Sequence, residues 1–104
     1  MPDFSEMTGF EWDDANRLKN WERHHVAWWE CEEAFFHKPF YVIRDMAHSQ
    51  KEDRYFALGR TKAGRPLFLA FTLRGSRIRV ISARDKSRRE RTIYDEKAKK
   101  NSTV

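Results

Sequence analysis

Residues 54–83 read RYFALGRTKAGRPLFLAFTLRGSRIRVISA. Three runs in this stretch, residues 54–60, 66–73 and 77–83, are rich in strand-forming residues. The two connections between them are short and contain glycine, which is typical of hairpins between antiparallel strands. The stretch therefore predicts an antiparallel sheet. The continuous apolar run 68–71 predicts that its middle strand is central and buried on both faces.

The last of these strands has two different faces. Side chains alternate across a strand, so Arg77 and Arg79 share one face while Ile78 and Val80 share the other. Arg84 stands where this strand ends, and its direction stays open. One face of the sheet is therefore expected to be packed and the other to be basic.

Two helices are predicted before this sheet. Asp13 is a suitable N-cap for a helix over residues 14–24, whose narrow apolar stripe consists of Ala15, Leu18 and Trp21. A second helical pattern begins at Val26 and ends before Pro39. Its apolar stripe contains Trp28, Cys31, Ala34 and Phe35.

The remaining elements complete an α+β chain. Residues 10–12 and 40–43 suit short strands, and the polar residues 45–53 suit a loop. Ser87 and Glu90 form a capping-box pattern before a helix over residues 88–100. We expect an antiparallel sheet of about four strands with two N-terminal helices and a C-terminal helix. Residues 10–98 then form one domain, between a flexible lead (1–9) and a frayed tail (99–104).

Positive charge is concentrated in the middle of the chain. Residues 1–53 hold 6 Lys/Arg against 12 Asp/Glu, whereas residues 54–91 hold 12 against 2, a local net charge of +10. Such an excess attracts polyanions or an acidic protein surface, although a solvated basic face has the same composition. No apolar run is long enough to span a bilayer, and the N-terminus does not resemble a signal peptide, so we expect a cytoplasmic protein.

Three segments of the chain resemble the BrnT family. They are Phe10-Glu11-Trp12-Asp13 followed by Asn20 and Arg23-His24; Glu52-Asp53-Arg54 followed by Gly59; and Ile78 to Arg84 followed by Arg88, Glu90-Arg91 and Tyr94. His25 stands where the family usually has a glycine. The resemblance implies a RelE-like fold and the toxin role of a type II toxin–antitoxin system. It also implies RNA cleavage without a metal, inhibited translation, and neutralisation by a BrnA-like antitoxin through which the complex contacts DNA.

Cleavage of RNA without a metal or other cofactor requires a proton acceptor for the 2′-hydroxyl and cations around the reacting phosphate. Arginine suits the second task because its planar guanidinium holds two phosphate oxygens and stays charged. The candidate catalytic residues are His24, Glu52, Arg77, Arg79 and Arg84. The candidate RNA-backbone contacts are Lys19, Arg23, Arg54 and Arg60. His24 equally suits a helix-end cap, and Glu52 an ion pair with Arg54.

Other functions remain open from the residues alone. The same basic segment would serve a non-catalytic nucleic-acid-binding module, or a protein-interaction module that docks an acidic partner. Trp21 and Trp29 are the tryptophans most expected to face outward, where they suit contact with an antitoxin better than base stacking. The four histidines do not form a convincing metal set, so no metal site is predicted.

Overall fold

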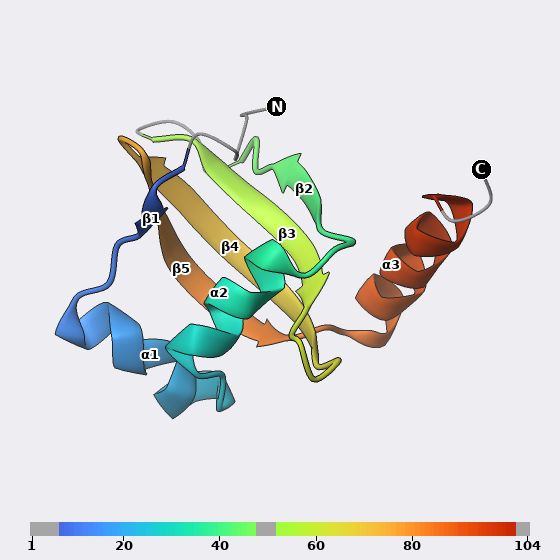
Figure 1. Ribbon diagram of the computed structural model, residues 1–104, viewed down its shortest axis with the longest axis horizontal. Coiled ribbons are helices and arrows are strands. Elements are labelled where there is room, and N and C mark those ends of the chain that lie inside the picture. The colour runs from blue at the N-terminus through green and yellow to red at the C-terminus, as the bar shows by residue number, and fades with distance from the viewer. Residues whose placement is uncertain (1–6, 48–51, 102–104) are drawn as a thin grey trace.

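The computed structural model describes residues 7–47 and 52–101, and it confirms the α+β class (Figure 1). The elements are β1 (Gly9–Phe10), α1 (Asp14–His24), α2 (Trp28–Phe36), β2 (Tyr41–Arg44), β3 (Arg54–Arg60), β4 (Pro66–Arg74), β5 (Arg77–Asp85) and α3 (Arg88–Asn101). The predicted hairpin strands and α1 agree with these bounds within two residues. Part of the predicted 45–53 loop, including His48, lies outside the described residues.

The sheet has five strands in the order β1-β5-β4-β3-β2. The four strands β2 to β5 are antiparallel, as expected, and β1 adds a parallel edge by pairing Gly9 with Arg77 and Phe10 with Ile78. The backbone N–H of Thr8 also donates to the carbonyl of Ser76 at 2.8 Å. The sheet is therefore mixed. The sequence did not predict the parallel pairing, because a two-residue strand has no periodicity that indicates its partner.

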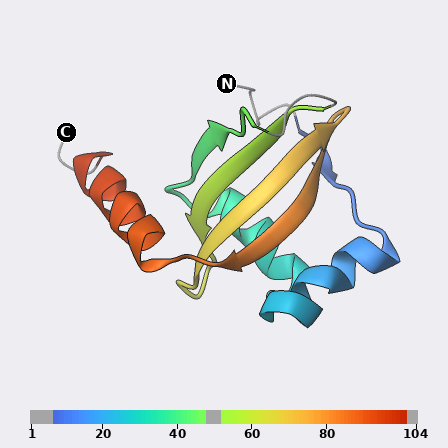
Figure 2. The same cartoon turned by 180° about the vertical axis from the view of Figure 1, so that it is seen from behind.

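Helix α2 crosses one face of the sheet and leaves the other largely open, whereas α1 lies beside the edge formed by β5 (Figures 1 and 2). The core between α2 and the sheet contains Val26, Cys31, Ala34, Leu67, Leu69, Phe71 and Val80, each with no exposed surface. On the opposite side of β4, which we call the open face, Phe68 and Ala70 are only partly buried. The prediction that this strand is buried on both faces is wrong there, because no helix covers that part of the sheet.

Helix α3 extends from the end of β5 and lies beside β2 and β3 (Figure 2). Its main anchor is Tyr94, whose hydroxyl donates to the carbonyl of Pro39 at 2.8 Å and whose ring packs against Tyr41 with centroids 5.5 Å apart. Most other side chains of α3 face solvent.

The edge of β5 that faces α1 is irregular and lacks a partner strand over most of its length. Ala70 pairs with Ser82 and Phe71 with Val80, so Ile81 forms a β-bulge with no partner in β4. On the opposite side, β1 pairs only with Arg77 and Ile78, so the buried backbone groups of β5 beyond Ile78 need other partners.

Polar side chains of α1 supply those partners. Asn16 Nδ2 donates to the carbonyl of Val80 at 2.7 Å, and Asn20 Oδ1 accepts from the backbone N–H of Ala83 at 3.0 Å. Lys19 Nζ donates to the carbonyl of Ile81 at 2.8 Å. Positions 16, 19 and 20 share one helical face.

The apolar stripe predicted for α1 does not face the sheet. Leu18 and Trp21 are 51% and 52% exposed, whereas Asn16 and Asn20 are buried. Trp21 faces outward as expected, and α1 contacts the sheet through Asn16 and Asn20 because these side chains pair with backbone groups of β5. In α2, Cys31 and Ala34 are buried as expected, but Trp28 is 37% exposed.

Candidate functional site

A hollow of about 710 Å³ lies between α1 and the open face. It is lined by Asp13, Asp14, Ala15, Asn16, Leu18, Lys19, Glu22 and Arg23, by Glu52, Arg54, Thr72 and Arg74, and by Arg79 and Ile81. We call this the α1 hollow. It brings together five predicted site residues from three segments of the chain: Lys19, Arg23, Glu52, Arg54 and Arg79.

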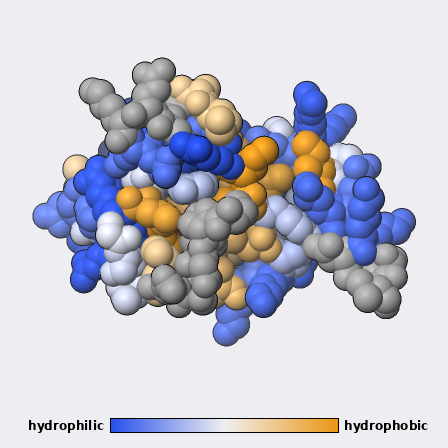
Figure 3. Space-filling model, turned by 90° about the horizontal axis from the view of Figure 1, so that it is seen from above, coloured by the Kyte–Doolittle hydropathy of each residue, from blue (hydrophilic) through white to orange (hydrophobic). Residues whose placement is uncertain are grey.

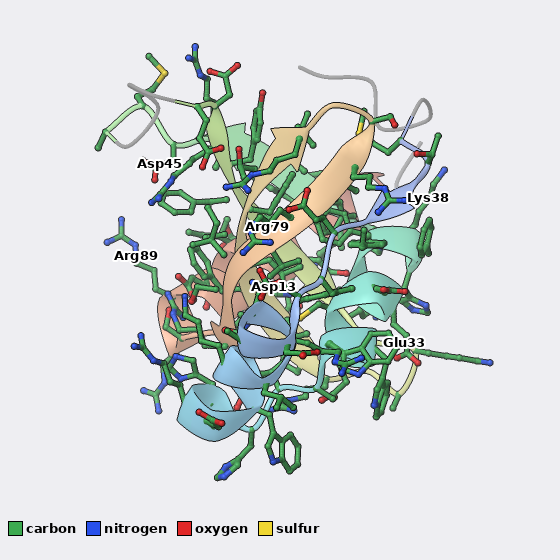
Figure 4. All side chains as sticks on the ribbon, turned by 90° about the vertical axis from the view of Figure 1, so that its left-hand side faces the viewer. Asp13, Glu33, Lys38, Asp45, Arg79 and Arg89 are labelled. Carbon is green, nitrogen blue, oxygen red and sulfur yellow. The ribbon has the colours of Figure 1, made fainter. Side chains whose placement is uncertain are left out.

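Arg79 is held between two carboxylates at the rim of the α1 hollow. Its Nη1 lies 3.1 Å from Glu11 Oε1 and its Nη2 lies 3.0 Å from Asp13 Oδ2. Figure 4 shows Asp13 and Arg79 facing each other across the start of α1. Asp13 is also the N-cap of α1, and the backbone N–H of Asn16, together with Arg79, holds the pKa of the Asp13 carboxyl below its ordinary 3.8. Two partners thus fix the Arg79 guanidinium in one orientation.

Glu52 faces a second arginine, Arg74, which the sequence analysis missed. Arg74 Nε lies 3.7 Å from Glu52 Oε2, and its Nη1 lies 3.5 Å from Glu11 Oε1. The signal was present in the sequence, because a two-residue turn places Arg74 directly opposite Arg77, on the same face of the sheet. Glu52 thus pairs with Arg74, and it reaches the α1 hollow from the loop before β3.

The α1 hollow is much less basic than the sequence of its strands suggests. Five basic side chains line it, but so do four acidic ones: Asp13, Asp14, Glu22 and Glu52. Asp14 and Glu22 belong to α1 and Asp13 is its N-cap, in the acidic part of the chain. Folding has brought the two halves of the charge distribution together, so the acidic side chains largely compensate the positive charge of this hollow.

Arg84 lies on the open face but outside the α1 hollow. Its guanidinium forms two hydrogen bonds to Glu90, at 2.8 and 2.9 Å, and lies 4.2 Å above the ring of Phe68. Arg84 keeps the pKa of Glu90 below its ordinary 4.5. The predicted capping box is confirmed, since the backbone N–H of Ser87 donates to Glu90 and that of Glu90 donates to Ser87 Oγ.

The other three predicted residues are also apart from the α1 hollow. His24 is exposed at the last turn of α1, where its backbone carbonyl accepts a hydrogen bond from Arg65 at 3.4 Å. Arg77 is exposed at the first position of β5. Arg60, at the end of β3, lines a separate, smaller pocket.

Comparison with known families assigns the chain. Residues 12–90 match the model of a family described as ribonuclease toxin, BrnT, of type II toxin–antitoxin systems. The chain belongs to the BrnT family. The resemblance found in the sequence is thereby confirmed. No curated protein matches the chain.

A solved BrnT structure has the same fold. The crystal structure of the Brucella abortus ribonuclease toxin BrnT superimposes with a TM-score of 0.59 at 24% sequence identity. The match covers 77% of this chain and 97% of that one. At this identity the comparison supports the fold and does not carry residue roles across.

The structure explains two positions of the BrnT resemblance. His25, where the family usually has a glycine, has φ 54° and ψ 36° in the left-handed region and ends α1. That conformation suits glycine best. Trp12, where the family match begins, donates its indole N–H to Glu32 at 2.8 Å and so ties the start of α1 to α2.

Two kinds of feature are absent from the described residues of this BrnT-family chain. Within residues 7–47 and 52–101, no group of three or more His, Cys, Asp or Glu side chains is arranged to hold a metal ion. Over the same part of the chain, no helix is both long and apolar enough to cross a membrane.

Proposed function

We propose that this chain is a metal-independent endoribonuclease that cleaves RNA at the α1 hollow and thereby inhibits translation in the cytoplasm. The observation that carries the proposal is the convergence of Glu52 with Arg79, Lys19, Arg23 and Arg54 around one hollow. A carboxylate and several fixed cations are the groups that RNA cleavage without a metal requires.

The roles follow from the chemistry of the step. Glu52 takes the proton of the 2′-hydroxyl, and the 2′-oxygen forms a bond to phosphorus. Arg79 donates to the phosphate oxygens, on which negative charge increases in the transition state. The bond from phosphorus to the 5′-oxygen breaks, and that oxygen takes a proton from the Lys19 ammonium. The products are a 2′,3′-cyclic phosphate and a free 5′-hydroxyl.

Position favours Glu52 over His24 as the proton acceptor, because Glu52 lines the α1 hollow and His24 does not. The same argument gives Arg79 the central catalytic task among the three predicted arginines. Arg84 is engaged by Glu90 and Phe68, and Arg77, exposed at the first position of β5, does not line the α1 hollow. Both are assigned to contacts with RNA beyond the reacting phosphate.

Labelled RNA incubated with the purified chain in EDTA tests this proposal. The native chain is expected to cleave, Glu52→Gln to lose about 10²–10⁴-fold in rate, and Arg79→Ala about 10²–10³-fold. Arg77→Ala removes the same charge from the same strand and is expected to lose far less. Thermal unfolding of each variant shows whether it acts through the fold.

Two results contradict the proposal. Cleavage that appears only after a divalent metal is added would exclude the metal-independent step. Intact RNA with retained, salt-sensitive binding would favour the alternative function, a non-catalytic nucleic-acid-binding module.

We also propose a BrnA-like antitoxin that binds DNA as the partner of this chain. Large aromatic side chains are exposed on α1 and α2, with Trp21 and Trp29 both 52% exposed and Phe36 78% exposed. Apolar patches interrupt an otherwise hydrophilic surface (Figure 3). Exposed aromatic residues of this kind are enriched in protein interfaces. Copurification of a coexpressed antitoxin is expected to weaken in a Trp29→Ala, Phe36→Ala variant and to persist in Arg79→Ala.

A further inference from the structure

A second, smaller pocket lies at the opposite end of the open face from the α1 hollow. It has a volume of about 180 Å³ and is lined by Arg60, Gly64, Pro66, Lys86, Arg91, Tyr94 and Asp95. We call it the Lys86 pocket. Pro66 in this pocket and Thr72 in the α1 hollow are six residues apart on β4, which corresponds to about 20 Å along a strand.

Lys86 is the most unusual residue of this pocket. Its side chain is only 4% exposed, and Nζ has no hydrogen-bond partner. Nζ lies 3.2 Å from the centroid of the Tyr94 ring, so one side of the ammonium is covered by an aromatic face. A buried ammonium has three N–H donors, and leaving them unsatisfied is costly.

Two arginines increase this cost. Arg60 and Arg91 line the same pocket, and in the part of the chain that the structure describes neither forms a salt bridge. Burial lowers the pKa of Lys86 from 10.5 to about 8, and the positive charges of Arg60 and Arg91 add to this effect. Asp95 and Glu90 oppose it by raising this pKa, but only Asp95 lines the pocket, where it faces three basic side chains.

We propose that the Lys86 pocket binds a phosphate group, and that in this chain the phosphate belongs to the backbone of bound RNA. The inference rests on the proposed function for its ligand, and it adds a second anchoring point about 20 Å from the reacting phosphate. A phosphate oxygen supplies the acceptor that Lys86 lacks, and its negative charge compensates three converging cations.

The charge balance of the two sites supports different roles, with the Lys86 pocket anchoring the RNA and the α1 hollow cleaving it. The α1 hollow has five basic and four acidic lining residues, whereas the Lys86 pocket has three basic and one acidic. Arg84 and the half-buried ring of Phe68 lie between them on the open face. An RNA strand crossing the sheet thus passes from a pocket that attracts phosphate to a hollow that is built to position it.

A binding experiment with uncleavable RNA tests the proposal. The probe is a single-stranded 2′-O-methyl RNA, whose affinity is measured by fluorescence anisotropy at several salt concentrations. Losing one phosphate contact is expected to reduce the slope of log K against log salt by about 0.7, which corresponds to about eightfold weaker binding at 50 mM salt. Arg60→Gln, Arg91→Gln is expected to show this loss.

A double variant of equal charge is the control. Arg88→Gln, Arg89→Gln removes two charges from α3 outside the pocket, and both side chains are exposed; Arg89 points away from the sheet in Figure 4. The slope is expected to stay close to that of the native chain. Equal losses in the two double variants would mean that only the general positive charge of this end matters, and would overturn the proposal.

NMR of the Lys86 side chain separates the possible sources of phosphate. Inorganic phosphate and the 2′-O-methyl RNA are each expected to move the Lys86 titration midpoint to higher pH, with the RNA acting at far lower concentration. A response to inorganic phosphate alone would establish an anion pocket and overturn the role in RNA binding. No response to either probe would overturn the site itself.

These readouts do not depend on catalysis. If the native chain fails to cleave RNA yet Lys86 responds to RNA, the proposed nuclease function fails and the phosphate pocket stands. If cleavage occurs and the pocket variants bind RNA normally, the phosphate pocket fails and the proposed nuclease function stands.

Discussion

Replacing Asn20 by alanine tests how α1 is attached to the sheet. Asn20 is 2% exposed, and its side-chain oxygen accepts a hydrogen bond of 3.0 Å from the backbone N–H of Ala83, which is itself fully buried. Alanine leaves this donor without a partner in a site that water does not reach. The same helix carries Lys19 and the N-cap Asp13, so the attachment also positions the α1 hollow.

The magnitude follows from two opposing terms. A buried donor left unsatisfied costs about 1–3 kcal/mol, and alanine has a higher helix propensity than asparagine by about 0.5 kcal/mol. We expect a net loss of about 1.5 kcal/mol in the free energy of unfolding. For a domain of about 100 residues this corresponds to a fall in Tm of roughly 10 °C.

Leu18→Ala is the matched comparison, because Leu18 is a large apolar residue of the same helix. Leu18 is 51% exposed, so its replacement is expected to cost about 1 kcal/mol or less. Urea unfolding of both variants, with unchanged m values, gives the two free energies. If Leu18→Ala costs more than Asn20→Ala, α1 is attached by its apolar stripe, and its proposed attachment through polar side chains is wrong.

Three further outcomes are expected. His25→Gly relieves the left-handed backbone at φ 54° and is expected to raise the free energy of unfolding by about 0.5–1 kcal/mol in denaturant titration; a loss would mean that the His25 side chain stabilises the turn. Gly59→Ala places a Cβ 2.9 Å from the Phe40 ring and is expected to cost about 1–3 kcal/mol, measured in the same way; a neutral result would show that the ring moves aside freely. Arg84 lowers the pKa of Glu90, so the stabilisation from this pair is complete above the unfolded-state value of about 4.5 and is lost as the pH falls through the lower folded-state value. Unfolding of Arg84→Gln across pH 2–7 is expected to show a deficit near neutral pH that shrinks in acid, and a deficit independent of pH would refute the assignment.

Local patterns determined most of the secondary structure. The glycine-containing connections fixed the hairpins of β3, β4 and β5, and alternation placed Arg77 and Arg79 on the open face. Asp13 and the Ser87–Glu90 pair marked the starts of α1 and α3, because caps act within one helical turn. The BrnT resemblance named residues that the fold then brought to one hollow from distant parts of the chain.

Only the tertiary structure decided which of those residues meet. The bulge at Ile81 decided which face of the sheet carries the Arg84 side chain. It shifts the alternation of side chains along β5 by one residue and so sets Arg84 opposite Phe68. The inward face of α1 depended on the outer edge of β5, since the groups that Asn16 and Asn20 satisfy belong to a strand more than sixty residues away. A sequence shows charges and periods along the chain. The pairing of acidic α1 with basic strands, and the burial of Lys86 without a partner, depend on distances between segments that no local pattern contains.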